Sequence, residues 1–274
     1  MTRYPAYRLL VKLYPNSIFQ DWQRFYSEFP EVYDEFVCYQ DCDGAVLDSV
    51  RRFVSIRGAV VADVGSGTGK YAFDMAAEAS HVHAVEPCLP MQERARQRAS
   101  LNGDVSERIT FLDAEAADIP LPNNSVDIVF ASHSLTAIHA RDVIRGLGMG
   151  ETEVTARFEA KTRAINEMMR ILRPRGWFFS ISASPNGFGG DLMNVVLGDK
   201  AETWASGKRY FLDWMKANYG FQDLQIATDW RFPSADIAAR SFGFIFGVET
   251  IGTILSTGII GIKNPVVMQS RQKE

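Results

Sequence analysis

Short apolar runs alternate, along the middle of the chain, with segments whose apolar residues recur at helical spacing. The runs cover residues 60–64, 81–85, 108–112, 126–131 and 177–182. Their length and their β-branched and aromatic content predict strands. The amphipathic segments between them predict helices, so strand and helix alternate along this part of the chain. That order is typical of a doubly wound α/β fold with a mostly parallel sheet.

The N-terminal flank has a different character from this middle part. Residues 1–43 are rich in aromatic side chains, and their spacing predicts a helix from Ser17 towards Phe29 and a second helix after Pro30. We expect this flank to form an N-terminal helical lid on the main domain, residues 44–274.

The remaining segments are expected to complete the main domain. A helix over residues 44–57 should lead into the first strand, and residues 184–220 form a predicted insertion after the fifth strand, with a helix over 201–219. The tail predicts a strand near 224–229, a helix over 234–246 and a last strand near 258–267.

The clearest motif is a turn with glycine at every second position. Gly65, Gly67 and Gly69 directly follow the first predicted strand, and a helical stretch follows them. Glycines adopt φ > 0 and let backbone N–H groups approach a ligand closely, and a helix N-terminus favours negative charge. Glu86 stands at the tip of the next predicted strand, where a carboxylate can accept both hydroxyls of a ribose. The unit therefore predicts a site for an adenosine-containing cofactor.

The glycine spacing separates two classes of cofactor-binding protein. Dinucleotide enzymes usually have G-x-G-x-x-G, whereas this chain has G-x-G-x-G preceded by Asp63. The stretch 63–69 resembles the first motif of the class I S-adenosylmethionine-dependent methyltransferases, of the ubiquinone/menaquinone-biosynthesis-like (type 11) kind. Residues 111–131 and 166–176 resemble later motifs of the same family, although Arg175 stands where a glycine is common.

The resemblance implies a seven-stranded, Rossmann-like sheet with an antiparallel last strand, and S-adenosylmethionine as the cofactor. It implies that Asp63 helps to hold the methionine amine, that Glu86 binds the ribose, and that Asp113 with its neighbour Ala114 meets the adenine. Tyr33 lies in a Tyr-Asp-x-Phe-like segment that touches the cofactor in the family. The residues assigned to the cofactor in this way are Tyr33, Asp63, Gly65, Ser66, Gly67, Gly69, Glu86, Pro87, Asp113, Ala114 and Ser132.

Two histidines are candidates for catalysis. His133 follows the fourth predicted strand directly, where ligands bind in an open parallel sheet, and His139 lies six residues further on. Either could act as a general base towards an acceptor, or be a hydrogen-bonded structural residue near the surface.

Composition narrows the range of partners. The 274-residue chain has a formal net charge of -4 and no Lys/Arg-rich run, which argues against binding to a nucleic-acid backbone. The three cysteines, Cys38, Cys42 and Cys88, suit reduced thiols in a cytoplasmic protein, and no further ligands stand at metal-binding spacing, so we expect no metal. We also expect no signal peptide, and the apolar stretch between Glu249 and Lys263 is too short for a membrane span.

The predicted function is methyl transfer from S-adenosylmethionine to a small-molecule acceptor through O, N or C. The aromatic residues within 184–220 would suit an apolar or aromatic acceptor, or would simply pack on the sheet. Residues 131–134 lack the Asn/Asp-Pro-Pro-aromatic signature of base amino methyltransferases, although a tRNA- or protein-directed enzyme stays open. An NAD-dependent oxidoreductase is disfavoured by the glycine spacing, and a non-catalytic cofactor-binding partner is a further alternative. The sequence leaves the oligomeric state open.

Overall fold

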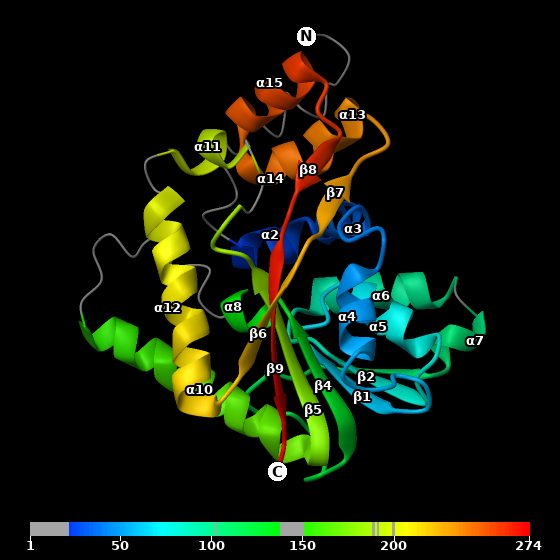
Figure 1. Ribbon diagram of the computed structural model, residues 1–274. Coiled ribbons are helices and arrows are strands. Elements are labelled where there is room, and N and C mark those ends of the chain that lie inside the picture. The colour runs from blue at the N-terminus through cyan, green and yellow to red at the C-terminus, as the bar shows by residue number, and fades with distance from the viewer. Residues whose placement is uncertain (1–21, 102, 138–150, 188–189, 191, 199–200) are drawn as a thin grey trace.

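Seven strands form one sheet at the centre of the protein. The computed structural model describes residues 22–101, 103–137, 151–187, 190, 192–198 and 201–274 (Figure 1). In spatial order the strands are β3 (Ile109–Leu112), β2 (His81–Val85), β1 (Val60–Val64), β4 (Val126–Ser132), β5 (Leu172–Ala183), β9 (Val266–Gln272) and β6 (Gln222–Ile226). Neighbours from β3 to β5 pair in parallel, and β9 pairs antiparallel with both β5 and β6. The predicted doubly wound fold with an antiparallel last strand is confirmed.

Helices cover both faces of the sheet because successive strand residues point to opposite sides. On one face, α4 (Ala45–Arg51) and α5 (Lys70–Ala76) pack on residues such as Val61 and Phe179. On the other face, α10 (Glu151–Ile171) and α12 (Ala201–Tyr219) pack on residues such as Ala62 and Phe178 (Figure 1). The short helices α7 (Gly103–Ser106) and α8 (Ser134–Ala137) and the longer α6 (Leu89–Ala99) complete this layer arrangement.

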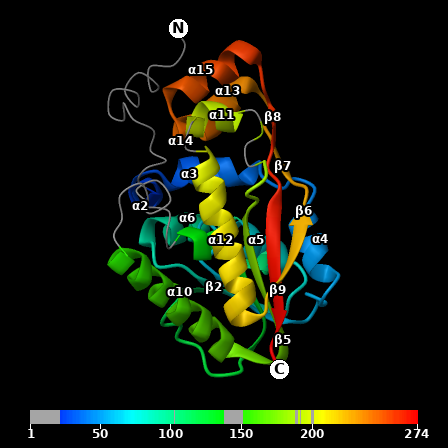
Figure 2. The ribbon, with the colours of Figure 1, turned by 60° about the vertical axis from the view of Figure 1, so that its left-hand side comes forward.

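A separate helical cap stands above the sheet (Figure 2). We use this name for α2 (Trp22–Glu28), α3 (Pro30–Cys38), α11 (Leu192–Leu197) and the segment 229–263, which share one apolar cluster. That segment contains β7 (Asp229–Arg231), α13 (Ala235–Ala238), a π-helical turn (Ala239–Gly243), α14 (Phe244–Phe246), α15 (Val248–Thr257) and β8 (Gly261–Lys263). The cap therefore joins the N-terminal flank to residues that lie about 200 positions later in the chain.

The tail differs from its prediction in two places. The expected strand near 258–267 is divided, because β8 pairs with β7 in a separate two-stranded sheet and β9 begins only at Val266. Pro265 lies between the two strands and has no N–H to donate to a ladder. The sequence prediction also missed α15, which ends at Gly258 in the left-handed conformation. At the other end of the domain, α4 stops at Arg51, earlier than the expected helix over 44–57.

Some expectations concern residues outside the described ranges. These are the helix start at Ser17 and the candidate catalytic residue His139. The helix expected after Pro30, the helix over 201–219 and the helix near 234–246 are all present, the last with a π-helical turn in its middle.

Strand β5 begins five residues before its predicted start, and its first part contains a bulge. Val126 pairs with Leu172, but Ile128 pairs with Trp177. Strand β5 therefore has more residues between these two pairs than β4 has, and the extra residues form the bulge. Arg175 takes φ +65 in this bulge. This is the position where a glycine is common in the resembling family, and the structure shows why, since a left-handed backbone costs an ordinary residue free energy.

Replacing Arg175 by glycine is expected to stabilise the fold. Relief of a left-handed residue contributes about 1–2 kcal/mol, and the extra freedom of glycine in the unfolded chain offsets about 0.4–1 kcal/mol of it. The expected net gain in the free energy of unfolding is about 0.5–1 kcal/mol, measured by urea denaturation. Arg175→Ala is the matched control, because it removes the same side chain but keeps the strained backbone, and it should give no gain.

Candidate active site

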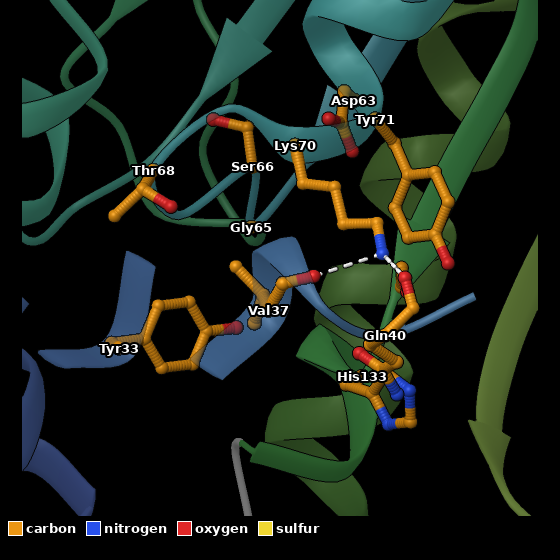
Figure 3. A pocket seen from close by; sticks show the side chains of 11 residues that line it. Tyr33, Val37, Gln40, Asp63, Gly65, Ser66, Thr68, Lys70, Tyr71 and His133 are labelled. Atoms are coloured by element: carbon orange, nitrogen blue, oxygen red, sulfur yellow. Dashed lines mark hydrogen bonds between the residues drawn. The ribbon is translucent and has the colours of Figure 1, made fainter. Parts of the chain in front are cut away.

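A pocket opens at the carboxyl ends of β1 and β4, between the glycine turn and α3 of the helical cap (Figure 3). It is lined by Tyr33, Val37, Gln40, Asp63, Gly65, Ser66, Thr68, Lys70, Tyr71, Ser132 and His133. Six of these side chains or backbones were predicted from the sequence as site residues: Tyr33, Asp63, Gly65, Ser66, Ser132 and His133. The position agrees with the rule that open α/β sheets bind ligands beyond the carboxyl ends of their strands.

The three glycines of the turn all adopt positive φ, at +75, +57 and +85. A Cβ on Gly65 would lie 2.2 Å from Cβ of Ser134, and a Cβ on Gly69 would lie 2.7 Å from the ring of Phe73. Those two glycines therefore allow close packing within the protein. Gly67 faces the cap instead, because its Cβ would lie 3.5 Å from the ring of Tyr33.

Glu86 connects the end of β2 to the glycine turn. Its carboxylate accepts hydrogen bonds from the backbone N–H of Gly67 and of Cys88, each at 2.9 Å. The side chain is buried, and burial raises the pKa of the Glu86 carboxyl. Each carboxylate oxygen still has a second lone pair, so the group is held in place and can accept further hydrogen bonds.

Asp63 is the most deeply buried acid of the site, with only 2% of its surface exposed. Burial, with the negative charge of Glu86 as the next cause, raises the pKa of the Asp63 carboxyl to about 8. At neutral pH the carboxyl therefore holds a proton in the protein alone. A cation brought beside it would favour the ionised form and release that proton.

Ion pairs hold α3 over the glycine turn. The buried carboxylate of Asp34 accepts from Arg94 Nε at 2.8 Å and from Arg98 Nη1 at 3.0 Å, and Arg98 also donates to the backbone oxygen of Thr68 at 3.0 Å. From the turn side, Lys70 Nζ donates to the backbone oxygens of Val37 and Gln40 at the end of α3 (Figure 3).

Tyr33, carried by this helix, is thereby placed against the turn. Its hydroxyl has a raised pKa because the side chain is buried close to the Glu86 and Asp63 carboxyls. The hydroxyl is therefore neutral at physiological pH and able to donate a hydrogen bond.

His133 follows β4 in a left-handed conformation, with φ +57. Its backbone N–H donates to the oxygen of Ile181 at 2.8 Å, which continues the pairing of β4 with β5. Burial and the positive charges of Lys208 and Lys70 lower the pKa of the imidazole to about 3. The ring is thus neutral and can accept a proton or a hydrogen bond. Positive φ is uncommon outside glycine, and its occurrence at a pocket marks a position whose geometry the fold enforces.

The other predicted cofactor residues lie on the same edge of the sheet but do not line the pocket. Asp113 is exposed and Ala114 half-buried after β3, whose Leu112 oxygen accepts from the N–H of Glu86 at 3.0 Å. Pro87 is exposed beside Glu86. Within the described ranges there is no group of three potential metal-ligating side chains, and the three cysteines are unpaired.

Several pocket residues were missed by sequence reasoning. The position of Lys70 directly after the third glycine could have suggested it, since a helix N-terminus usually favours acids rather than a cation. Gln40 and Val37 give no local signal, because only the packing of α3 brings their backbone to the turn.

Three hydroxyl groups around the turn lack hydrogen-bond partners in the part of the chain that the structure describes. The hydroxyl oxygens of Ser66, Thr68 and Ser134 are buried and have no hydrogen-bond partner among the described residues. Buried polar groups are normally hydrogen-bonded, so an unmatched set at one pocket indicates a place for a polar ligand.

Comparisons with known proteins identify a methyltransferase domain in this chain. A family model described as a methyltransferase domain matches residues 61–148. The chain is 28% identical over 128 residues to a demethylmenaquinone methyltransferase of Clavibacter sepedonicus, covering 47% of this chain and 42% of that protein. It is 27% identical over 202 residues to a 27-O-demethylrifamycin SV methyltransferase of Amycolatopsis mediterranei, covering 68% and 66%. The matched part spans between 19% and 66% of the length of the curated relatives.

A solved structure shares the fold. The YcgJ protein of Bacillus subtilis superposes with a TM-score of 0.54 at 14% identity, covering 85% of this chain and 99% of that one. Within the part of the chain that the structure describes, no helix is both long and apolar enough to cross a membrane. The motif at the end of β1, the strand order and the matching domain model agree: the chain carries a methyltransferase domain and is similar to class I S-adenosylmethionine-dependent methyltransferases of the type 11 kind.

Proposed function

We propose that this protein transfers the methyl group of S-adenosylmethionine to a small-molecule acceptor. The observation that carries the proposal is the pocket at the ends of β1 and β4, where the glycine turn, the buried Asp63 carboxyl and a neutral histidine meet, and where the turn is bonded to the buried Glu86. Two of the relatives named above, a demethylmenaquinone methyltransferase and a 27-O-demethylrifamycin SV methyltransferase, support a small molecule as acceptor.

The residues present fit the cofactor. S-adenosylmethionine carries an ammonium, a carboxylate and two ribose hydroxyls, and the pocket offers groups of complementary charge and hydrogen-bonding capacity. The unpartnered hydroxyls of Ser66, Thr68 and Ser134 could bond the polar ends of the molecule. Gly67 has no side chain where a ligand would pass between the turn and Tyr33.

The candidate residues would each contact a different part of the cofactor. Asp63 would hold the ammonium of the methionine part, and Glu86 would accept from the ribose hydroxyls while the N–H groups of Gly67 and Cys88 fix its orientation. Asp113 and Ala114, at the adjacent strand end, would contact the adenine. Tyr33 would cover the bound molecule from the cap and reduce its contact with water.

On the acceptor side, the cofactor supplies an already activated methyl group on a sulfonium. The chain has to align the acceptor atom with that group and exclude water. His133 lines the pocket with a neutral ring, so it could accept a hydrogen bond from an oxygen or carbon acid, and it would serve as a general base only where the bound acceptor raises the lowered pKa of the imidazole; an amine acceptor would need no base. Ser132, at the end of β4, lines the pocket and would contact the bound cofactor.

The first experiment is a calorimetric titration of the purified protein with S-adenosylmethionine, S-adenosylhomocysteine and NAD. Binding of the two sulfur compounds and no binding of NAD is expected. An acceptor screen with a labelled methyl donor then tests transfer. Binding of NAD alone would overturn the proposal, and tight binding without transfer to any acceptor class would favour a non-catalytic cofactor-binding role.

Glu86→Gln tests the ribose contact. The change keeps the size of the side chain but removes the charge and one acceptor oxygen, and hydrogen bonds to charged groups contribute about 1.5–3 kcal/mol. We expect the affinity for S-adenosylhomocysteine to fall about 10- to 100-fold, measured by the same titration. Glu249→Gln, at an exposed position of α15, is the control. Unchanged affinity in Glu86→Gln would remove the ribose assignment.

A further inference from the structure

Two lysines lie in an unusual environment beside the candidate active site. Lys161, on α10, is 96% buried, since only 4% of its surface is exposed, and its Nζ lies 3.9 Å from the ring centre of Phe211 and 5.3 Å from that of Phe158. Lys208, on α12, is half-buried, with Nζ 5.5 Å from the ring centre of Trp204. Among the described side chains, neither lysine has a carboxylate within ion-pair distance.

Such an arrangement is unfavourable for the protein alone. Burying an ammonium without a counter-ion costs several kcal/mol, and a cation–π contact offsets only about 0.5–2 kcal/mol of that. Burial accordingly lowers the pKa of Lys161 to about 6 and that of Lys208 to about 8. The other lysine of α12 shows the usual solution, because Lys216 pairs with both Asp213 and Asp223.

Two observations connect the helices that carry these lysines to the pocket. Leu135 of α8, two residues after His133, packs in the same apolar cluster as Ala164 of α10 and Phe211 of α12 (Figure 1). The positive charge of Lys208 also contributes to the lowered pKa of both Lys161 and His133, so the three groups are within electrostatic reach of one another.

We propose that Lys161 and Lys208 form a subsite that binds an anionic group of the methyl acceptor, a carboxylate attached to an apolar body. The inference rests on the function proposed above. The carboxylate would supply the counter-ion that both ammonium groups lack, and the rings of Trp204, Phe211 and Phe158 would contact the apolar body. Together with the neutral ring of His133, the subsite would select acidic acceptors over neutral molecules of the same shape.

The test uses matched pairs of small molecules. Benzoate, 2-naphthoate, hexanoate and decanoate are titrated calorimetrically, each beside its neutral amide, into the free protein and into the protein loaded with S-adenosylhomocysteine. At least one carboxylate is expected to bind about tenfold more tightly than its amide, as a charge-assisted hydrogen bond predicts. The preference should be lost in Lys161→Met and in Lys208→Met.

Lys216→Met is the matched control, because this lysine lies on the same helix but is already paired. It should keep the carboxylate preference. The unfolding temperature of Lys161→Met should be at least that of the unmodified protein, since the change removes a buried amine from an aromatic environment and keeps its volume. A loss of preference in a stable variant therefore cannot be ascribed to unfolding.

The outcomes separate this inference from the proposed function. If no carboxylate is preferred over its amide, or if both lysine variants keep the preference, the subsite is wrong. If S-adenosylhomocysteine fails to bind, the proposed function is wrong, and the titrations of the free protein still decide whether the anion subsite exists.

Discussion

Replacing Asp63 by asparagine is expected to weaken binding of S-adenosylhomocysteine about 10- to 100-fold, because an ammonium loses its buried counter-ion. Asp63 is 2% exposed and lines the pocket at the end of β1. Asparagine has nearly the same shape, so the loss would reflect charge and not packing. Asp74→Asn, at an exposed position of α5 that does not line the pocket, is the control and should bind normally.

The same variant should remove a proton-linked component of binding. The pKa of Asp63 is about 8 in the protein alone, and an adjacent ammonium lowers it. At about pH 7, binding should therefore release up to about one proton, which calorimetry detects as a dependence of the measured heat on the ionisation enthalpy of the buffer. Asp63→Asn should show no such release, and equal release from both proteins would contradict the assignment.

Stability should follow pH with a defined sign. An unfolded aspartate has a pKa of about 3.9, so between about pH 4 and about pH 8 the folded protein holds more protons at Asp63 than the unfolded chain. This group therefore makes the fold less stable as pH rises through that window. Asp63→Asn lacks this effect. The unfolding temperature of the variant minus that of the unmodified protein should therefore increase as pH rises from about 5.5 to about 8. A constant difference between the two would show that Asp63 is ionised in the folded state.

Phe242→Ala is expected to destabilise the protein by about 3–5 kcal/mol, the usual cost of removing a large aromatic side chain from a core. Phe242 has no exposed surface, and its ring lies 4.5 Å from that of Phe246, 5.2 Å from that of Trp230 and 5.9 Å from that of Phe36. It therefore joins the N-terminal helix α3 to the segment 229–263 within the helical cap.

The measurement is urea denaturation followed by tryptophan fluorescence and by far-UV circular dichroism. Phe242→Leu keeps most of the volume and should lose about 1.5 kcal/mol or less, which distinguishes packing from any change in the π-helical turn. Since Phe36 and Tyr33 lie on the same helix, the alanine variant should also weaken cofactor binding. A loss in stability below about 1 kcal/mol would mean that the cap contributes little to the fold.

Local sequence pattern was sufficient for the sheet and its glycine turn. The β-branched runs predicted β1 to β5 because buried parallel strands require such residues, and the positive φ of Gly65, Gly67 and Gly69 could be anticipated since few other residues tolerate it. The pocket position followed from strand order alone. The same reasoning was less successful in the tail, where it missed α15 and joined β8 and β9 into one expected strand, because short apolar runs suit either structure.

The sequence by itself therefore determined the fold and the glycine turn, and it identified Asp63 and Glu86 as candidate acids beside that turn. Each of these features depends on residues that are adjacent in the chain or one strand apart. Only the tertiary structure brought Lys70 to the end of α3, Phe242 to Phe36, and Lys161 to Phe211. Contacts between distant segments depend on how complementary surfaces pack, and packing has no periodic signature along the chain. The charge and proton occupancy of the site also depend on tertiary structure. Burial shifts the pKa of Asp63, His133 and Lys161, and burial results from packing and not from any single residue.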